Sequence, residues 1–433
     1  MLLKRKLGWP LLLFFSFSPI IIWSFAVLPI SYRFYDMYST FESLGVVMGL
    51  IGITMFSLSL VLSARMEIFE DFFGGMNRVY IAHHILGGTS FIFLLVHPLF
   101  LAGSRVTISW KTAAQFLIPG TDLWINLGIT ALLCMITLLV ITLYVKLPYQ
   151  LWRFTHKFMG AVFLLGTIHA VFVSGAFQGF KPLAYYMYFI FFVGLIAYFY
   201  RTIAGRFLVR RKKYSVVNVK MVNPSVTEVD MIPVNKPIKA IPGQFIFVYF
   251  KSAGVSNETH PFSVSTIAPD GKISISAKSS GDYTETLKNI QAGDVATIEG
   301  AFGRFNYALY KNYNQVWIAG GIGITPFLSM AQNLADPQYQ ITLYYSVTNP
   351  EEAVYLPELL QLSQAKPNFK VIPIYTKTMG RLSAETIAQQ VGDIAKYDFF
   401  LCGPPPMMKS MHKQLNQIKV RDTKIHSEEF AIC

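Results

Sequence analysis

Apolar and polar positions follow two different rules along this chain. Up to about residue 200, apolar runs of roughly 20 residues, long enough to cross a bilayer as helices, alternate with short polar connections. These runs predict six membrane-spanning helices, at residues 11–30, 43–63, 79–101, 123–144, 152–174 and 183–200. Pro10, Pro19 and Pro29 make the first the least regular of them. We expect this first run to be retained rather than removed as a secretory signal, because it is long and no small-residue cleavage site follows it.

The pattern changes after a basic segment at residues 206–213. From Tyr214, short alternating strands are broken by glycine, proline and asparagine. From about residue 314, strands predicted at 316–319, 342–347, 370–374 and 399–401 alternate with helices that begin at Thr325, near 356 and after Pro406. This alternation is typical of an α/β nucleotide-binding domain. We therefore predict three domains, at residues 1–205, 206–313 and 314–433.

The composition agrees with a membrane protein. With 53% hydrophobic and 14% charged residues, the chain of 433 residues is too apolar for a soluble protein. The formal net charge of +13 does not indicate nucleic-acid binding, because the basic residues flank apolar segments instead of forming a separate stripe. Cys134, Cys402 and Cys433 are too few and too scattered for a disulfide framework or a zinc site.

Lysine and arginine are distributed unequally between the two sides of the predicted bundle. The N-terminus, the 64–78 and 145–157 connections and the 201–213 segment together hold 14 of them. The other three connections hold four, Arg33, Arg105, Lys111 and Lys181. Because basic loops remain on the cytoplasmic side, we expect a multi-pass protein of the cell membrane with both termini in the cytoplasm.

Four histidines lie in two of the predicted helices, His83 and His97 in the third and His156 and His169 in the fifth. Both helices run in the same direction, so the first histidine of each is expected at the cytoplasmic side and the second at the outer side. A rise of about 1.5 Å per residue separates the two histidines of a helix by roughly 20 Å, so two haems could stack through the bilayer. Each iron would take one imidazole from each helix.

The spacing of these histidines leaves part of the ligand set open. On an ideal helix, the 14-residue spacing in the third helix turns one histidine about 40° from the other, whereas the 13-residue spacing in the fifth turns it about 140°. The fifth helix would need to unwind, and we place this change near Gly166. His84, 13 residues before His97, remains an alternative ligand to His83. His84 and Lys157 are also candidates to contact haem propionates.

Similar five-residue segments begin at His83 and His156, each with a second His or a Lys, two apolar residues and then Gly87 or Gly160. A glycine one turn after the ligand would leave room for a macrocycle against the helix. With the paired histidines, these segments resemble the ferric-reductase-like transmembrane family, which includes NADPH oxidases and metalloreductases. The resemblance implies two haem b groups, an inner and an outer one, held by the four histidines.

The strand-rich middle of the chain resembles the FAD domain of ferredoxin reductases. Residues 242–245 precede one strand, and four residues that open another are implied at the isoalloxazine ring: His260, Pro261, Phe262 and Ser263. Lys278, Gly281 and Thr284 lie between a strand and a helix, where backbone N–H groups, a hydroxyl and a positive charge meet. In the FAD domain this segment binds the pyrophosphate. The turn at residues 300–303 departs from that domain, since Ala301 stands where proline is common.

The α/β region carries two segments that resemble the NAD(P) domain of the same reductases. The first is a glycine loop where phosphate can approach a helix N-terminus, with Gly320, Gly321, Gly323, Thr325 and Pro326. The second resembles the segment beneath the nicotinamide, with Cys402, Gly403, Pro404 and Pro405. The expected fold class is therefore a multi-domain membrane protein, with a six-helix transmembrane bundle followed by an antiparallel β-barrel FAD domain and an α/β NAD(P)-binding domain.

The resemblance also implies a catalytic set for hydride transfer, formed by Ser263, Cys402 and Phe430, the last as a near-terminal aromatic that covers the flavin. NADPH is the expected donor, with NADH possible. Residues 346–349 lack the arginine that often holds the 2′-phosphate, which leaves Lys377 and Arg381 as substitutes.

Electrons are expected to pass from cytoplasmic NAD(P)H through FAD and the two haems to an acceptor on the outer face. Dioxygen, giving superoxide, is the first expectation for that acceptor. A ferric chelate, or an extracytoplasmic redox partner protein, stays open, because the basic outer connections would attract superoxide and an anionic chelate equally well. The sequence contains no calcium-binding loop and no proline-rich docking tract, so we expect constitutive activity or control by substrate supply.

Overall fold

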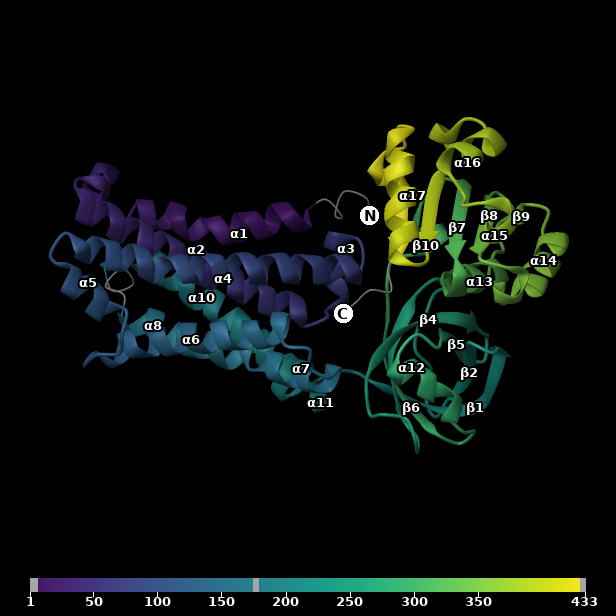
Figure 1. Cartoon of the computed structure of the whole chain (residues 1–433), viewed down its shortest axis with the longest axis horizontal. Coiled ribbons are helices and arrows are strands. Elements are labelled where there is room, and N and C mark those ends of the chain that lie inside the picture. Colours follow the sequence, from purple (N-terminus) through teal and green to yellow (C-terminus); the bar gives the residue numbers. More distant parts are fainter. Residues whose placement is uncertain (1–6, 174–178, 429–433) are drawn as a thin grey trace. The chain divides into compact units, whose positions relative to one another are not determined.

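The computed structural model describes residues 7–173 and 179–428, and the chain divides into two compact units, Met1–Val209 and Arg210–Cys433. The first unit is helical, and the second contains two sheets with helices around one of them (Figure 1). Of the positions named from the sequence, Phe430 and Cys433 lie outside the described residues.

Long apolar helices build the first unit. Among the described residues, five segments are long and apolar enough to cross a membrane: α2 (Met37–Ser63), α4 (Met76–Val106), α6 (Leu123–Tyr144), α7 with α8 (Tyr149–Lys157 and Met159–Val173), and α10 (Lys181–Tyr198) continued by the π-helix η3 (Phe199–Ile203). Short helices α3 (Glu67–Phe73), α5 (Trp110–Phe116) and α11 (Gly205–Leu208) lie between or after them. Asp36 and Asp122 cap the starts of α2 and α6.

The first predicted helix differs in its bounds. Helix α1 spans Gly8–Ser24, so with 17 residues it is shorter than the five segments named above. The helix ends at Ser24, so the rest of the predicted run to residue 30 does not continue it. A short 3-10 helix, η2 (Ile30–Phe34), follows. Pro19 is tolerated inside α1.

The surface of this unit is apolar, as a bilayer requires. Large side chains that face outward along α4 and α6 include Ile81, Ile85, Ile92, Leu99, Leu133 and Val140, each more than a third exposed. In a protein surrounded by water such a surface would be an aggregation hazard, whereas in lipid it is the contact surface. The prediction of a membrane protein is therefore confirmed.

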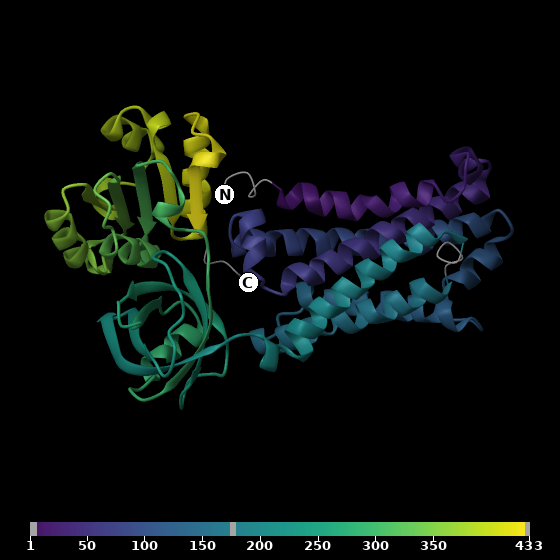
Figure 2. The same cartoon turned by 180° about the vertical axis from the view of Figure 1, so that it is seen from behind.

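Helices α2 and α4 lie side by side and pack closely (Figures 1 and 2). A Cβ atom added at Gly45 would lie 2.6 Å from Leu101, and one at Gly52 would lie 2.7 Å from Leu94. Ser90 donates a hydrogen bond to the carbonyl of Gly52 at 2.8 Å. Small residues thus allow the two backbones to approach, as is usual between membrane helices.

The second unit begins with a closed six-stranded antiparallel barrel, in the order β1-β2-β5-β4-β3-β6. Its strands are β1 (Lys212–Asn223), β2 (Val226–Pro233), β3 (Phe245–Lys251), β4 (His260–Ile267), β5 (Ile273–Lys278) and β6 (Val295–Phe302). The inward side chains, among them Val229, Ile246, Val264, Ile275 and Ile298, fill the interior and are fully buried. Helix α12 (Asp282–Thr286) and the 3-10 turn η4 (Leu287–Asn289) follow β5.

A parallel sheet of five strands, in the order β11-β10-β7-β8-β9, forms the α/β domain. The strands are β7 (Asn314–Gly320), β8 (Gln340–Val347), β9 (Phe369–Tyr375), β10 (Asp398–Cys402) and β11 (Ile425–Glu428). The helices are α13 (Thr325–Gln332), α14 (Leu356–Ala365), α15 (Thr376–Met379), α16 (Ala384–Val391) and α17 (Pro405–Gln417). Separate apolar cores, one around Trp317 and Leu343 and the other around Ile318 and Met411, pack on the sheet.

The predicted fold class is confirmed, with some elements added to the expectation. The sequence did not predict α15, α16 or β11. Strand β11 is short and reads Ile425, His426, Ser427, Glu428, so it lacks the apolar run that identifies a buried strand. It is nevertheless paired in parallel with β10 at the sheet edge.

Candidate cofactor sites

The four membrane histidines form two pairs. His83 and His97 lie on α4, His156 lies on α7 and His169 on α8. The ring centroids of His83 and His156 are 6.2 Å apart, and those of His97 and His169 are 6.5 Å apart. Each pair joins one helix to another, as predicted, and no group of three or more His, Cys, Asp or Glu side chains suited to a metal occurs in the described residues.

The centroid distances fit two imidazoles that hold one metal ion between them. A metal–nitrogen bond is about 2 Å long and the ring centroid lies roughly 1 Å behind the nitrogen, so two axial imidazoles would place their centroids roughly 6 Å apart. Both pairs meet this value. The residues present therefore fit a haem at each level.

Three of the four histidines are oriented by backbone carbonyls of a neighbouring helix or its first turn. Nδ1 of His83 donates to the carbonyl of Ser59 at 2.9 Å, and Nδ1 of His97 donates to the carbonyl of Gly45 at 2.7 Å. His169 uses the carbonyl of Trp124 at 2.8 Å. Because Nδ1 carries the proton in each case, Nε2 is the nitrogen left free for a metal.

His156 is held differently. Its Nδ1 is buried without a hydrogen-bond partner in the part of the chain that the structure describes. Its ring stacks on Trp152, with centroids 5.5 Å apart and planes 10° from parallel. The His83/His156 pair therefore combines one histidine held by a hydrogen bond and one held by an aromatic contact.

The twist between His156 and His169 is resolved by a helix break, but not at Gly166. Gly166 lies inside the continuous helix α8. The break is at Phe158, where α7 ends, and the N–H of Phe158 bonds the carbonyl of Thr155 in a tighter turn. One residue outside the helical ladder changes the angle between the two histidines enough for both to face α4.

His84 is exposed, and its ring lies beside that of His83 with centroids 5.5 Å apart. The histidine of α4 whose ring faces His156 is His83. The geometry thus favours His83 over His84 as the partner of His156.

Two glycines that were not predicted from the sequence make room for His97 and His169. A Cβ atom at Gly49 would lie 2.8 Å from Nδ1 of His97, and one at Gly128 would lie 2.6 Å from the ring of His169. The glycines that were singled out have other neighbours. Gly160 accommodates the ring of Tyr198, and Gly87 lies against Ser59.

The residues predicted at the isoalloxazine ring lie on β4 of the barrel. Ser263 is 4% exposed, and its hydroxyl has no hydrogen-bond partner among the described residues. A buried hydroxyl without a partner is unusual, so this atom fits the role of a donor or acceptor for a bound ligand. Phe262 is buried beside it. His260 stacks on Tyr283, with centroids 3.8 Å apart, and its Nε2 lies 2.6 Å from the carboxylate of Glu258.

Tyr283 was missed by sequence reasoning, although it lies inside the segment predicted to bind pyrophosphate. Its ring is buried and its hydroxyl, like that of Ser263, has no partner in the described residues. In the same segment, the hydroxyl of Thr284 accepts hydrogen bonds from the N–H groups of Ser280 and Gly281, at 3.0 and 3.1 Å. Those two N–H groups are therefore engaged within the turn itself, and Lys278 stays exposed next to it.

The two nicotinamide segments contact each other at the carboxyl edge of the sheet. They follow β7 and β10, which are neighbouring strands. A Cβ atom at Gly323 would clash with the carbonyl of Cys402, and one at Gly403 would lie 3.0 Å from the backbone of Gly320. The glycines thus permit backbone-to-backbone packing at the point where the strand order turns, the usual place for a nucleotide.

Cys402 is fully buried at the end of β10. Burial, together with the nearby carboxylate of Glu428, raises the pKa of the Cys402 thiol well above its ordinary value. The group is therefore an uncharged thiol at neutral pH. Lys377 and Arg381 are exposed near the end of β9, and the N–H of Lys377 bonds the carbonyl of Thr348 at 3.1 Å.

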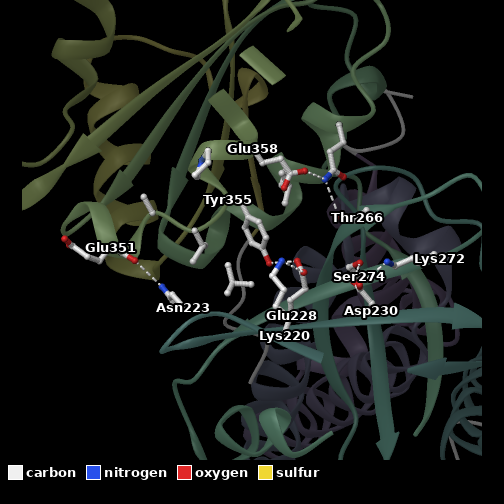
Figure 3. A pocket seen from close by; sticks show the side chains of 16 residues that line it. Lys220, Asn223, Glu228, Asp230, Thr266, Lys272, Ser274, Glu351, Tyr355 and Glu358 are labelled. Carbon is white, nitrogen blue, oxygen red and sulfur yellow. Dashed lines mark hydrogen bonds and ion pairs between the residues drawn. The ribbon is translucent and has the colours of Figure 1, made fainter. Parts of the chain in front are cut away.

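A cleft of about 570 Å³ opens between the barrel and the α/β domain (Figure 3). It is lined by charged and polar side chains of both parts, among them Lys220, Glu228, Gln332 and Tyr355. None of its lining residues belongs to the predicted flavin or nicotinamide segments. The cleft is therefore a feature separate from the predicted cofactor sites.

Membrane helices, a flavin-type barrel and a nucleotide-binding sheet in one chain define the class of membrane-bound flavoprotein oxidoreductases. Family models match all three parts: "Ferric reductase like transmembrane component" over residues 48–167, "FAD-binding domain" over 211–315 and "Oxidoreductase NAD-binding domain" over 317–413. The chain thus has the domain architecture of the ferric-reductase-like transmembrane superfamily, as the sequence predicted.

Relatives match this chain over part of its length. The 2-halobenzoate 1,2-dioxygenase electron transfer component of Burkholderia cepacia is 27% identical over 222 residues, which are 48% of this chain and 61% of that protein. The flavohemoprotein of Rhodopirellula baltica is 31% identical over 128 residues, 27% of this chain and 31% of the relative. The chain therefore spans less than two thirds of the length of these relatives.

A solved structure, the flavohemoglobin from Malassezia yamatoensis with bound FAD and heme, is similar with a TM-score of 0.52 and 16% sequence identity. The match covers 91% of this chain and 97% of that one. At this identity the similarity concerns the fold alone.

Proposed function

We propose that this chain is a transmembrane oxidoreductase that moves electrons from cytoplasmic NAD(P)H to an acceptor on the outer face of the cell membrane. The observation that carries the proposal is that four histidines form two pairs, each with the ring-centroid distance expected for two imidazoles on one metal ion. The same chain continues into flavin and nicotinamide domains. FAD and two haem b groups would supply the hydride acceptance and the one-electron transfers.

The protein's own contribution begins with orientation. The carbonyls of Ser59, Gly45 and Trp124 fix the tautomer of His83, His97 and His169, which makes each imidazole a stronger ligand through Nε2. Between the two levels, Phe163 is fully buried and packs edge-on against Phe56. Such apolar packing keeps water out of the space between the two pairs.

In the second unit, the free hydroxyl of Ser263 would hydrogen-bond the flavin, and the packed loops at Gly323 and Cys402 would seat the nicotinamide. Cys402 would act as a neutral side chain, since its thiol keeps its proton. NADPH is the proposed donor, with NADH as the alternative, and Lys377 and Arg381 supply positive charge for a 2′-phosphate.

Two matched variants test whether His83 or His84 is the haem ligand that pairs with His156. His83→Ala should remove one haem, about half of the total, because its ring faces His156. His84→Ala should retain both, because its ring is exposed and lies outside the pair. Haem content and the optical spectrum of the purified protein measure the difference. Loss of haem in His84→Ala with retention in His83→Ala would reverse the assignment.

Dioxygen is the proposed acceptor, and a ferric chelate is the alternative that the family description of residues 48–167 favours. Purified, FAD-loaded protein with NADPH separates them. Reduction of cytochrome c that superoxide dismutase abolishes indicates superoxide. Fast anaerobic reduction of a ferric chelate, with a cytochrome c signal insensitive to the dismutase, would instead identify a metalloreductase.

A further inference from the structure

Tyr355 reaches from the α/β domain into the barrel. It directly precedes α14, is 9% exposed, and has a left-handed backbone with φ of 61°. Its hydroxyl lies 2.6 Å from Oε2 of Glu228 on β2 (Figure 3). It also lies 2.7 Å from Oγ of Ser276 on β5. A bulky residue keeps this rare backbone conformation only where its surroundings hold it, so the contact is specific.

The contacts of Tyr355 continue to the strand that carries the predicted flavin residues. The hydroxyl of Ser276 also lies 3.2 Å from that of Ser265. Ser265 lies on β4, two residues after Ser263. On the other side, Oε1 of Glu228 pairs with Lys220 at 3.5 Å, which holds the carboxylate in place.

A second contact ends on the same strand. The side-chain amide of Gln332 donates to the hydroxyl of Thr266 on β4 at 3.3 Å and to Glu358 on α14 at 2.8 Å. Gln332 is the last residue of α13, the helix that begins at Thr325 in the predicted nucleotide loop. Helix α13, which follows the predicted glycine loop, is therefore joined to β4, and Tyr355, which precedes α14, is joined to the neighbouring strand β5.

The contacts of Tyr355 lie where the barrel and the α/β domain also pack through apolar side chains. Val222 and Val226 of the barrel share a core with Val354, and the polar side chains of the cleft lie beside it. Burial, together with the hydrogen bond to Glu228, raises the pKa of Tyr355 above its ordinary value. The phenol therefore stays a hydrogen-bond donor throughout the usable pH range.

We propose that Tyr355 is a positioning residue for hydride transfer, which aligns the α/β domain with the barrel through its hydrogen bonds to Glu228 and Ser276. The inference rests on the proposed function, because it requires a nicotinamide on the α/β domain to reduce a flavin on the barrel. A hydride moves two electrons and one proton directly between two rings, so a small shift of one domain slows it strongly.

The test uses the full-length, FAD-loaded protein in detergent, mixed anaerobically with NADPH while flavin absorbance is recorded. Tyr355→Phe keeps the ring and removes both hydrogen bonds. Tyr344→Phe is the matched control, because Tyr344 is a buried tyrosine whose hydroxyl bonds Gln390 at 2.8 Å within the α/β domain alone. We expect flavin reduction at saturating NADPH to slow roughly tenfold or more in Tyr355→Phe, with FAD content and NADPH affinity unchanged.

Tyr344→Phe should reduce flavin at the wild-type rate. The single variant Glu228→Gln should reduce flavin faster than Tyr355→Phe and nearly as fast as the wild type, because the amide oxygen still accepts a hydrogen bond from Tyr355. Equal rates in Tyr355→Phe and Tyr344→Phe, or a change in NADPH affinity alone, would overturn the proposal. If Tyr355→Phe does not fold, Ser276→Ala removes one of the two bonds and should slow the reaction by a smaller factor; an unchanged rate there also overturns it. Absence of flavin reduction in the wild type would instead contradict the proposed function.

Discussion

The two units of this protein position their candidate cofactor residues by different physical means. In the membrane unit, side chains form the sites, and backbone carbonyls of neighbouring helices orient them, as Gly45 orients His97. In the second unit, backbone approaches backbone, as where Gly323 lies against the carbonyl of Cys402. Where side chains form a site, one of them can be removed while the surrounding helices keep their fold. Where two backbone segments touch, there is no room for an added atom. We therefore expect substitutions in the membrane unit to remove a bound group, and substitutions in the second unit to push packed loops apart.

The largest expected effect is the loss of one of the two proposed haems from the membrane unit. His97→Ala should remove the haem proposed for the His97/His169 pair, because only His169 would remain to hold it. About half of the haem should remain, and electron transfer to an outer acceptor should fall to background. Reduction of a soluble dye by NADPH should continue, since the second unit is untouched. Full haem content in the variant would contradict the ligand assignment.

The next effect tests the backbone site. Gly323→Ala places a methyl group against the carbonyl of Cys402, so the two loops must separate. We expect reduction of the flavin by NADPH to slow by about 100-fold, because the nicotinamide loses its seat. Stopped-flow absorbance measures the rate, and the haem spectrum should stay that of the wild type. A normal rate would show that the loops tolerate separation.

These two sites also differ in how much of them could be predicted from the sequence. The glycine loop and the segment at Cys402 were predicted together from their resemblance to the NAD(P) domain of ferredoxin reductases, and the structure places them after the neighbouring strands β7 and β10. The histidine pairs were predicted from spacing, but the helix break was placed near Gly166 and occurs at Phe158. A break depends on packing between helices, which periodicity in one helix does not contain.

Residues whose role depends on a distant neighbour were missed for the same reason. Gly49 and Gly128 matter because His97 and His169 lie against them, 48 and 41 residues away along the chain (97 minus 49 and 169 minus 128). Tyr355 matters through Glu228 and Ser276 on the barrel. Nothing in the local sequence of these positions indicates such a contact.

A smaller effect tests whether the membrane helices tolerate an added Cβ atom better than the packed loops at Gly323 and Cys402 do. Gly128→Ala would place a Cβ atom 2.6 Å from the ring of His169, which must then turn. We expect the affinity for haem at the outer pair to weaken by about tenfold, as for a lost supporting contact. Gly88→Ala is the control, because nothing lies within 4 Å of a Cβ atom there. Equal haem retention in both variants would mean that His169 has freedom to adjust.

The smallest effect concerns the orientation of His83. The hydroxyl of Ser59 lies 2.9 Å from Nδ1 of His83, and the carbonyl of Ser59 lies at the same distance. Ser59→Ala removes the hydroxyl and leaves the carbonyl, so the imidazole keeps its main acceptor and its tautomer. A hydrogen bond contributes about 1 kcal/mol, which corresponds to about 40 mV for a one-electron couple.

We therefore expect Ser59→Ala to retain both haems and to shift the midpoint potential of the inner one by about 40 mV or less. A spectroelectrochemical titration resolves this shift and leaves the outer haem as an internal reference. Haem loss in this variant would show that the hydroxyl, rather than the backbone, orients His83. The membrane unit would then depend on side-chain hydrogen bonds as the contact between the barrel and the α/β domain does at Tyr355, and the contrast between the two units would narrow.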